Sequence, residues 1–170
     1  MTIPDIALKY VGIKEISNNM GFKDPIFEQR MRSVGFDNGD AWCCLFTELV
    51  WKEYYQDDPY IYKEIDRLFS DSCIVTLANF RQSPFRVDHT PLEGAIMIMQ
   101  RFKKDNDKYL ATWQGHAGII VDIRGKEIVT VEGNTNEHGA REGDTVALKS
   151  RLLNFNLHTG LVLKAFIHPI

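Results

Sequence analysis

Two adjacent cysteines, Cys43 and Cys44, follow the turn-forming residues 38–40 and begin an apolar stretch. A cysteine thiolate is a strong nucleophile, and the free N–H groups and dipole at a helix N-terminus stabilise its negative charge. Adjacent side chains on a helix point about 100° apart, so one can face a cleft while the other packs inward. Cys43 lies nearer the free N–H groups, and we favour it as nucleophile over Cys44. An unreactive buried thiol is the competing interpretation.

A cysteine nucleophile needs a base, which is usually histidine. His116 stands at the beginning of an apolar segment, residues 115–121, whose alternation places His116 and Gly118 on one face of a strand. A glycine beside the histidine leaves room for another element to approach. The remaining histidines lie in loops or near the C-terminus, where a surface role is the default: His89, His138, His158 and His168.

An acidic residue that could orient the base follows on the next predicted strand. A hairpin turn expected at residues 123–126 places Glu132 directly opposite His116, where a carboxylate can accept the imidazole N–H. A register shifted by one residue would place Gly133 opposite His116 and would move Glu132 to the other face of the sheet. Asn134, just beyond the strand end, can donate its amide to the same site. Otherwise Glu132 is an exposed strand carboxylate and Asn134 a turn residue.

The elements that must position these side chains divide the chain into two halves. Helical spacing before residue 82 gives way to strand-like alternation after residue 94, which predicts an α+β fold. Two of the expected helices begin at Thr2-Pro4 and at Asp24-Pro25. Three more cover residues 41–55, 60–69 and 72–81. The expected strands are 95–102, 115–123, 127–132, 145–152 and 161–167. We expect residues 103–108 to form an exposed loop and Cys73 to be a core residue of its helix.

Composition excludes several classes of protein. A length of 170 residues predicts a single domain, 1–170, and a net charge of −3 leaves no basic excess to bind nucleic acid. No apolar run approaches the roughly 18 residues of a membrane span, so we expect no membrane insertion. The N-terminus shows no signal-peptide pattern, which predicts synthesis in the cytoplasm. An odd number of cysteines, three, fits poorly with a disulfide framework.

Four segments together resemble the motifs of CHAP domains, the cysteine, histidine-dependent amidohydrolases/peptidases. They are Ala41-Trp42-Cys43, Pro91-Leu92-Glu93-Gly94-Ala95-Ile96, Gly115-His116-Ala117-Gly118-Ile119-Ile120 and Val131-Glu132-Gly133-Asn134. The resemblance implies a papain-like fold, with N-terminal helices packed on a C-terminal antiparallel sheet, and needs no cofactor. It implies Cys43 as nucleophile, His116 as general base, Glu132 as the orienting residue and Asn134 as an assisting group. Ala95 departs from the pattern, because an acidic residue is common there.

The resemblance implies a peptidoglycan hydrolase, either an N-acetylmuramoyl-L-alanine amidase or a peptide cross-link endopeptidase, and we expect a monomer. Without a leader, such an enzyme would reach the wall through holin lesions, on a phage particle or by a secretion system. The alternatives are a non-catalytic wall-binding or virion structural protein, and a papain-like acyltransferase or protease acting elsewhere.

Further residues are candidates for binding. A substrate groove is expected from Glu15, Asn18, Asn19, Trp42 and Trp113, although core packing is the simpler interpretation of both tryptophans. Some relatives bind calcium upstream of the cysteine, where this chain has Asp37 and Asp40. That segment is short, and we favour a plain turn and no metal.

Overall fold

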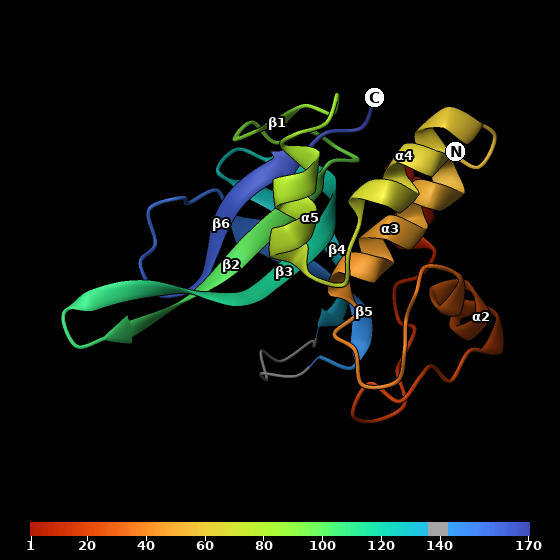
Figure 1. Ribbon diagram of the computed structural model, residues 1–170, viewed down its shortest axis with the longest axis horizontal. Helices are drawn as coiled ribbons and strands as arrows, with labels where there is room; N and C mark the ends of the chain where they lie inside the picture. Colours follow the sequence, from red (N-terminus) through yellow and green to blue (C-terminus); the bar gives the residue numbers. More distant parts are fainter. Residues whose placement is uncertain (136–142) are drawn as a thin grey trace.

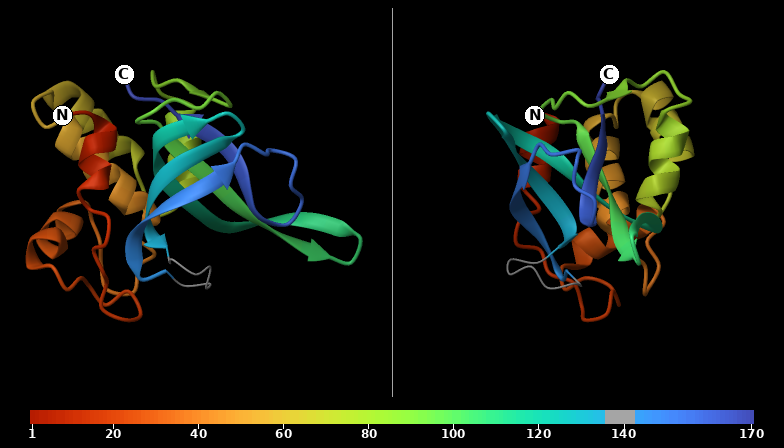
Figure 2. Two further views of the ribbon diagram at one scale, coloured as in Figure 1. Left: turned by 180° about the vertical axis from the view of Figure 1, so that it is seen from behind. Right: turned by 90° about the vertical axis from the view of Figure 1, so that its left-hand side faces the viewer.

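The computed structural model describes residues 1–135 and 143–170 and has an α+β fold. In this described part, helices occupy the first half and an antiparallel sheet the second, as predicted (Figures 1 and 2). The helices are α1 (Ile3–Leu8), α2 (Pro25–Ser33), α3 (Cys43–Tyr54), α4 (Pro59–Leu68) and α5 (Cys73–Phe80). The strands are β1 (Val87–Asp88), β2 (Ile96–Asp105), β3 (Lys108–Arg124), β4 (Glu127–Thr135), β5 (Thr145–Leu152) and β6 (Gly160–Ile167).

Most helices begin at a side chain that accepts hydrogen bonds from the first turn. Thr2, Asp24, Asp58 and Ser72 occupy the N-cap positions of α1, α2, α4 and α5 and accept backbone N–H groups there. Helix α3 is the exception, since its N-cap residue Trp42 makes no capping bond with its side chain in the described structure. Burial on nearly every side of α3 explains its mixed apolar spacing.

The sheet has the strand order β1-β6-β2-β3-β4-β5. The strand β1 was not predicted, because two residues are too few to show alternation. The prediction of a loop at 103–108 was wrong. Strands β2 and β3 continue as a hairpin that pairs Asp105 with Lys108 and projects beyond the rest of the molecule (Figure 1). Both faces of this hairpin are largely exposed, so its sequence lacks the apolar alternation of a half-buried strand.

The predicted register between β3 and β4 was wrong by two residues. The structure pairs Ile120 with Thr130, whereas the prediction set His116 opposite Glu132. The hairpin turns at residues 125–126, where Gly125 has a positive φ of 63°, and β3 carries an irregularity just after Ile120. Because a shift of two residues preserves the face of a strand, His116 and Glu132 still lie on the same side of the sheet.

Apolar side chains cover both faces of the sheet. The larger core lies between the helices and one face and includes Trp51 and Phe46 from α3 and Ile98 from β2. A smaller core, including Met97 and Phe166, lies on the opposite face. Among the described residues, the structure contains no helix with the length and apolar character that a membrane span requires.

Candidate active site

The first residue of α3, Cys43, lies where the helix meets the sheet. Trp42 is fully buried, and its indole N–H donates to Glu15 Oε2 over 2.8 Å. Gly133 of β4 makes this approach possible, since a Cβ there would lie 2.6 Å from the Trp42 ring and 2.8 Å from Phe46 Cβ. These contacts fix the start of α3 against β4, so the Cys43 thiol has a defined position.

His116 lies between the Cys43 thiol and the Glu132 carboxylate. Its Nε2 is 2.7 Å from Glu132 Oε2, and the imidazole also interacts with the Cys43 thiol and helps to lower its pKa. Gly118 allows this geometry, because a Cβ there would lie only 2.6 Å from Glu132 Cγ. The predicted association of these three side chains is present. The room left by Gly118 is filled by Glu132 and its neighbours on β4.

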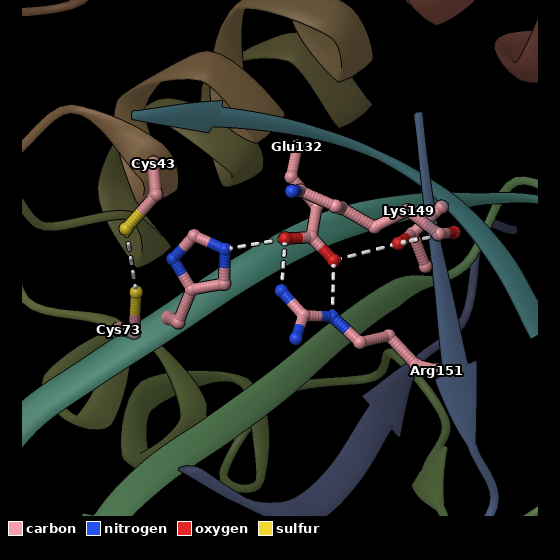
Figure 3. A network of polar contacts seen from close by, with 7 residues as sticks. Cys43, Cys73, Glu132, Lys149 and Arg151 are labelled. Carbon is pink, nitrogen blue, oxygen red and sulfur yellow. Dashed lines mark hydrogen bonds and ion pairs between the residues drawn. The ribbon is translucent and has the colours of Figure 1, made fainter. Parts of the chain in front are cut away.

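The fully buried Glu132 carboxylate also binds Arg151 and Thr130, two partners that were not predicted from the sequence. Arg151 donates from Nε to Oε1 over 2.8 Å and from Nη2 to Oε2 over 2.6 Å (Figure 3). Thr130 Oγ1 donates to Oε1 over 2.7 Å. The sequence gives only a weak signal for these two partners. Thr130 precedes Glu132 by two residues and so shares its strand face, and Arg151 is one of several polar residues in the predicted strand that becomes β5. Only the pairing of β4 with β5 brings them together.

The charges in this network favour a thiolate and an imidazolium. A hydrogen bond from Cys73 and contacts with His116 lower the pKa of Cys43 well below its usual value, although burial opposes this. Burial would lower the pKa of His116, but the Glu132 carboxylate and the Cys43 thiolate raise it to about 10. Burial would raise the pKa of Glu132, but the charge of His116 and the hydrogen bond from Arg151 hold it far below its usual range. A thiolate–imidazolium pair is a nucleophile ready for attack.

Cys73, predicted to be a core residue, is buried but also contacts Cys43. The two Sγ atoms lie 3.6 Å apart (Figure 3), and both residues line the same pocket. Cys44 is fully buried, and its thiol donates to Thr76 Oγ1 over 3.3 Å. Its side chain is absent from the pocket lining, so the geometry favours Cys43 over Cys44 as the nucleophile.

The pocket has a volume of about 830 Å³ and contains both partners of the thiolate–imidazolium pair. Asn134, Asn19 and the largely exposed Trp113 contribute to its wall. Gln114 also lines it, and in the described part of the chain its buried Oε1 has no hydrogen-bond partner. The charged residues of the wall are Asp40, Asp71, Arg101, Lys149 and Arg151.

Three of the five expected groove residues lie outside the pocket wall. Trp42 is in the core, and Glu15 is buried beneath it as the acceptor of its indole N–H, so both support the start of α3. Asn18 is exposed with a positive φ of 63° and is not part of the pocket wall.

The region considered for calcium forms the expected turn. Asp40 Oδ2 accepts the backbone N–H of Asp37 over 2.9 Å, and Asp37 lies 3.7 Å from the Arg32 guanidinium. Within residues 1–135 and 143–170, no group of three or more histidine, cysteine, aspartate or glutamate side chains is placed to hold a metal ion. His138, considered as a surface histidine, lies outside the described residues.

Replacing Gly118 by alanine should disturb the orientation of His116. The new Cβ would overlap Glu132 Cγ and press on the Val131 carbonyl oxygen, which lies 3.2 Å away. We expect a loss of roughly 1–3 kcal/mol in the free energy of unfolding, as for other overpacked interiors. Denaturant unfolding measures this loss, and an unchanged midpoint would contradict the close approach of β3 and Glu132.

The activity of the thiolate–imidazolium pair should have a broad plateau against pH. On the acid side activity falls as the Cys43 thiolate is protonated, well below the usual thiol range. On the alkaline side it falls as His116 loses its proton near its pKa of about 10. Because the carboxylate of Glu132 helps to raise that pKa, Glu132→Gln should move the alkaline limb of kcat/KM to lower pH. An alkaline limb that does not move would disprove this coupling.

The same shift in the pKa of His116 affects stability. Its value in the folded protein lies above the ordinary 6.5, so the stabilisation is complete below about pH 6.5 and is lost as pH rises through about 10. The pKa of Glu132 is lowered, so its contribution is present above the ordinary value of 4.5 and is lost on acidification. Both contributions coexist at neutral pH.

No family model matches the chain, no curated protein matches its sequence, and no solved structure matches its fold at a significant level. The functional interpretation therefore depends on the residues and contacts described above.

Proposed function

We propose that this protein is a cysteine hydrolase that cleaves an amide bond of bacterial peptidoglycan. The observation that carries the proposal is the contact of Cys43, at the start of α3, with His116, whose Nε2 is bound by Glu132. Such a nucleophile, base and orienting group are the requirements of acyl transfer through a thioester. The choice of peptidoglycan comes from the resemblance of the sequence motifs to CHAP domains.

The proposed reaction begins with attack of the Cys43 thiolate on the amide carbonyl carbon. The tetrahedral intermediate collapses to a thioester as His116 protonates the leaving amine. His116, now neutral, takes a proton from water, and the resulting hydroxide attacks the thioester and releases the carboxylate product. Glu132 stays ionised throughout, because Arg151 and Thr130 bind both of its oxygens.

The groups around Cys43 support stabilisation of the developing oxyanion. The N–H groups in the first turn of a helix have no intrahelical partners, and Trp42 does not cap them with its side chain in the described structure. The backbone N–H of Cys43 is therefore the candidate oxyanion donor. Removal of one such donor typically costs about 10²–10³ in rate.

The pocket wall suits a peptide that carries charges of both signs. Asp40 and Asp71 lie close to the starts of α3 and α5, and Arg101 comes from β2. Gln114 offers a buried carbonyl oxygen that can accept a substrate N–H. Stem peptides of peptidoglycan contain carboxylates, amines and many amide groups, so they match this wall.

Digestion of purified sacculi tests the proposal. Sacculi with different cross-bridges should release new amino groups, and mass spectrometry of the fragments should identify the bond. Loss of the peptide from the lactyl group of muramic acid would indicate an amidase, and cleavage within stems or bridges an endopeptidase. If no sacculus type yields new ends while the protein stays folded, the hydrolase proposal fails.

A further inference from the structure

Two helices begin at a cysteine, and these two cysteines meet at the pocket. Cys43 is the first residue of α3 and Cys73 the first residue of α5. Their Sγ atoms are 3.6 Å apart, which is direct contact between two sulfurs (Figure 3). Gly115 of β3 permits this approach, because a Cβ there would lie 2.7 Å from Cys73 Cβ. The fold thus brings a second thiol against the nucleophile.

The two thiols have different chemical properties. The hydrogen bond from Cys73 lowers the pKa of Cys43, and that same bond, with contributions from Cys44 and burial, raises the pKa of Cys73. Cys43 is therefore the thiolate and Cys73 the protonated donor. Thiolates react with peroxides much faster than thiols do, and oxidation-sensitive sites commonly pair a thiolate of low pKa with a second cysteine.

We propose that Cys43 is a site of reversible oxidation and that Cys73 is its resolving thiol. The Cys43 thiolate attacks hydrogen peroxide, which breaks the O–O bond, forms a sulfenic acid and releases hydroxide. The Cys73 sulfur then attacks the Cys43 sulfur, and the S–O bond breaks. The departing hydroxyl takes the Cys73 proton and leaves as water. The sulfurs must close from 3.6 Å to the roughly 2.05 Å of a disulfide, a movement of about 1.5 Å.

This pairing would protect the nucleophile from irreversible oxidation. A sulfenic acid without a neighbouring thiol proceeds to sulfinic acid, which ordinary thiols do not reduce. A Cys43–Cys73 disulfide would instead be restored by thiol–disulfide exchange. The chemistry of the disulfide depends only on the two thiols, whereas its effect as an off-switch rests on the proposed hydrolase function.

The experiment treats the protein of residues 1–170 with a small excess of hydrogen peroxide and measures its intact mass under denaturing conditions. Wild-type protein should become two hydrogens lighter, and its thiols reactive with an alkylating reagent in denaturant should fall from the three free cysteines to one. Dithiothreitol should reverse both changes. Cys73→Ser should instead gain two oxygens, and dithiothreitol should not remove them.

Cys44 provides the matched control, because it is adjacent to Cys43 in sequence but bonded to Thr76. Cys44→Ser should still lose two hydrogens and retain no alkylatable thiol. Disulfide formation that disappears in Cys44→Ser, or wild-type protein that gains oxygens and keeps its hydrogens, would overturn the proposal. These mass changes do not require hydrolase activity. Failure of the oxidation proposal can therefore be distinguished from failure of the hydrolase proposal, which digestion of sacculi tests.

Discussion

Replacing Cys43 by alanine is expected to reduce kcat/KM for the release of amino groups from sacculi by about 10⁴-fold or more. The thiolate is the proposed attacking atom, and loss of the nucleophile from a coupled catalytic set typically removes nearly all of the rate enhancement. The variant keeps the other residues of the pocket wall, including its charged side chains, so it should still bind sacculi. A binding assay with sedimented sacculi, run beside the amine assay, measures both.

Cys44→Ala is the matched control for this variant. Cys44 is fully buried and bonded to Thr76, away from the pocket wall. Its loss should lower stability slightly and leave kcat/KM within a few-fold of wild type. Full activity in Cys43→Ala together with inactive Cys44→Ala would move the nucleophile to Cys44. Unchanged biological effect in both variants would favour a non-catalytic wall-binding or virion structural protein.

Much of the fold could be predicted from the sequence because its signals are local. The caps at Thr2, Asp24 and Ser72 mark helix starts, and alternation from residue 145 to residue 152 gives β5 with its correct bounds. The exposed hairpin at 103–108 could not be predicted from alternation, since neither face is buried there. Its pairing comes from backbone hydrogen bonds, which leave little trace in side-chain pattern.

The sequence predicts which strand face each site residue lies on, but it does not predict the exact pairing of the strands. His116 and Glu132 lie on one face in any register shifted by an even number of residues, so a register error of two left their association correct. The contacts of Arg151 and Cys73 depend on which strand pairs with β4 and how closely α5 approaches β3. These are long-range features, and Gly115 and Gly118 reveal their role only once their neighbours are known.

Arg151→Met should be the most destabilising change among the residues that support His116. It leaves the fully buried Glu132 carboxylate with His116 and Thr130 as its remaining partners, and it removes both guanidinium hydrogen bonds. Breaking a buried ion pair commonly costs roughly 3–5 kcal/mol. The Arg151 side chain is 27% exposed, and His116 still balances the charge, so we expect about 2–3 kcal/mol. Denaturant unfolding at neutral pH measures this difference.

A double-mutant cycle separates the ion pair from simple loss of packing. Glu132→Gln combined with Arg151→Met removes the buried carboxylate that has lost its guanidinium partner, so the double variant should be more stable than Arg151→Met alone. If the two single effects add, Arg151 acts through packing and the proposed charge balance is wrong. Arg151→Met should also raise the pKa of Glu132, because a hydrogen bond from Arg151 helps to lower it. Raising the folded-state pKa of Glu132 toward its ordinary value of 4.5 reduces the stability that is lost on acidification, so below about pH 4.5 the variant should lose less stability than the wild type, which packing alone would not cause.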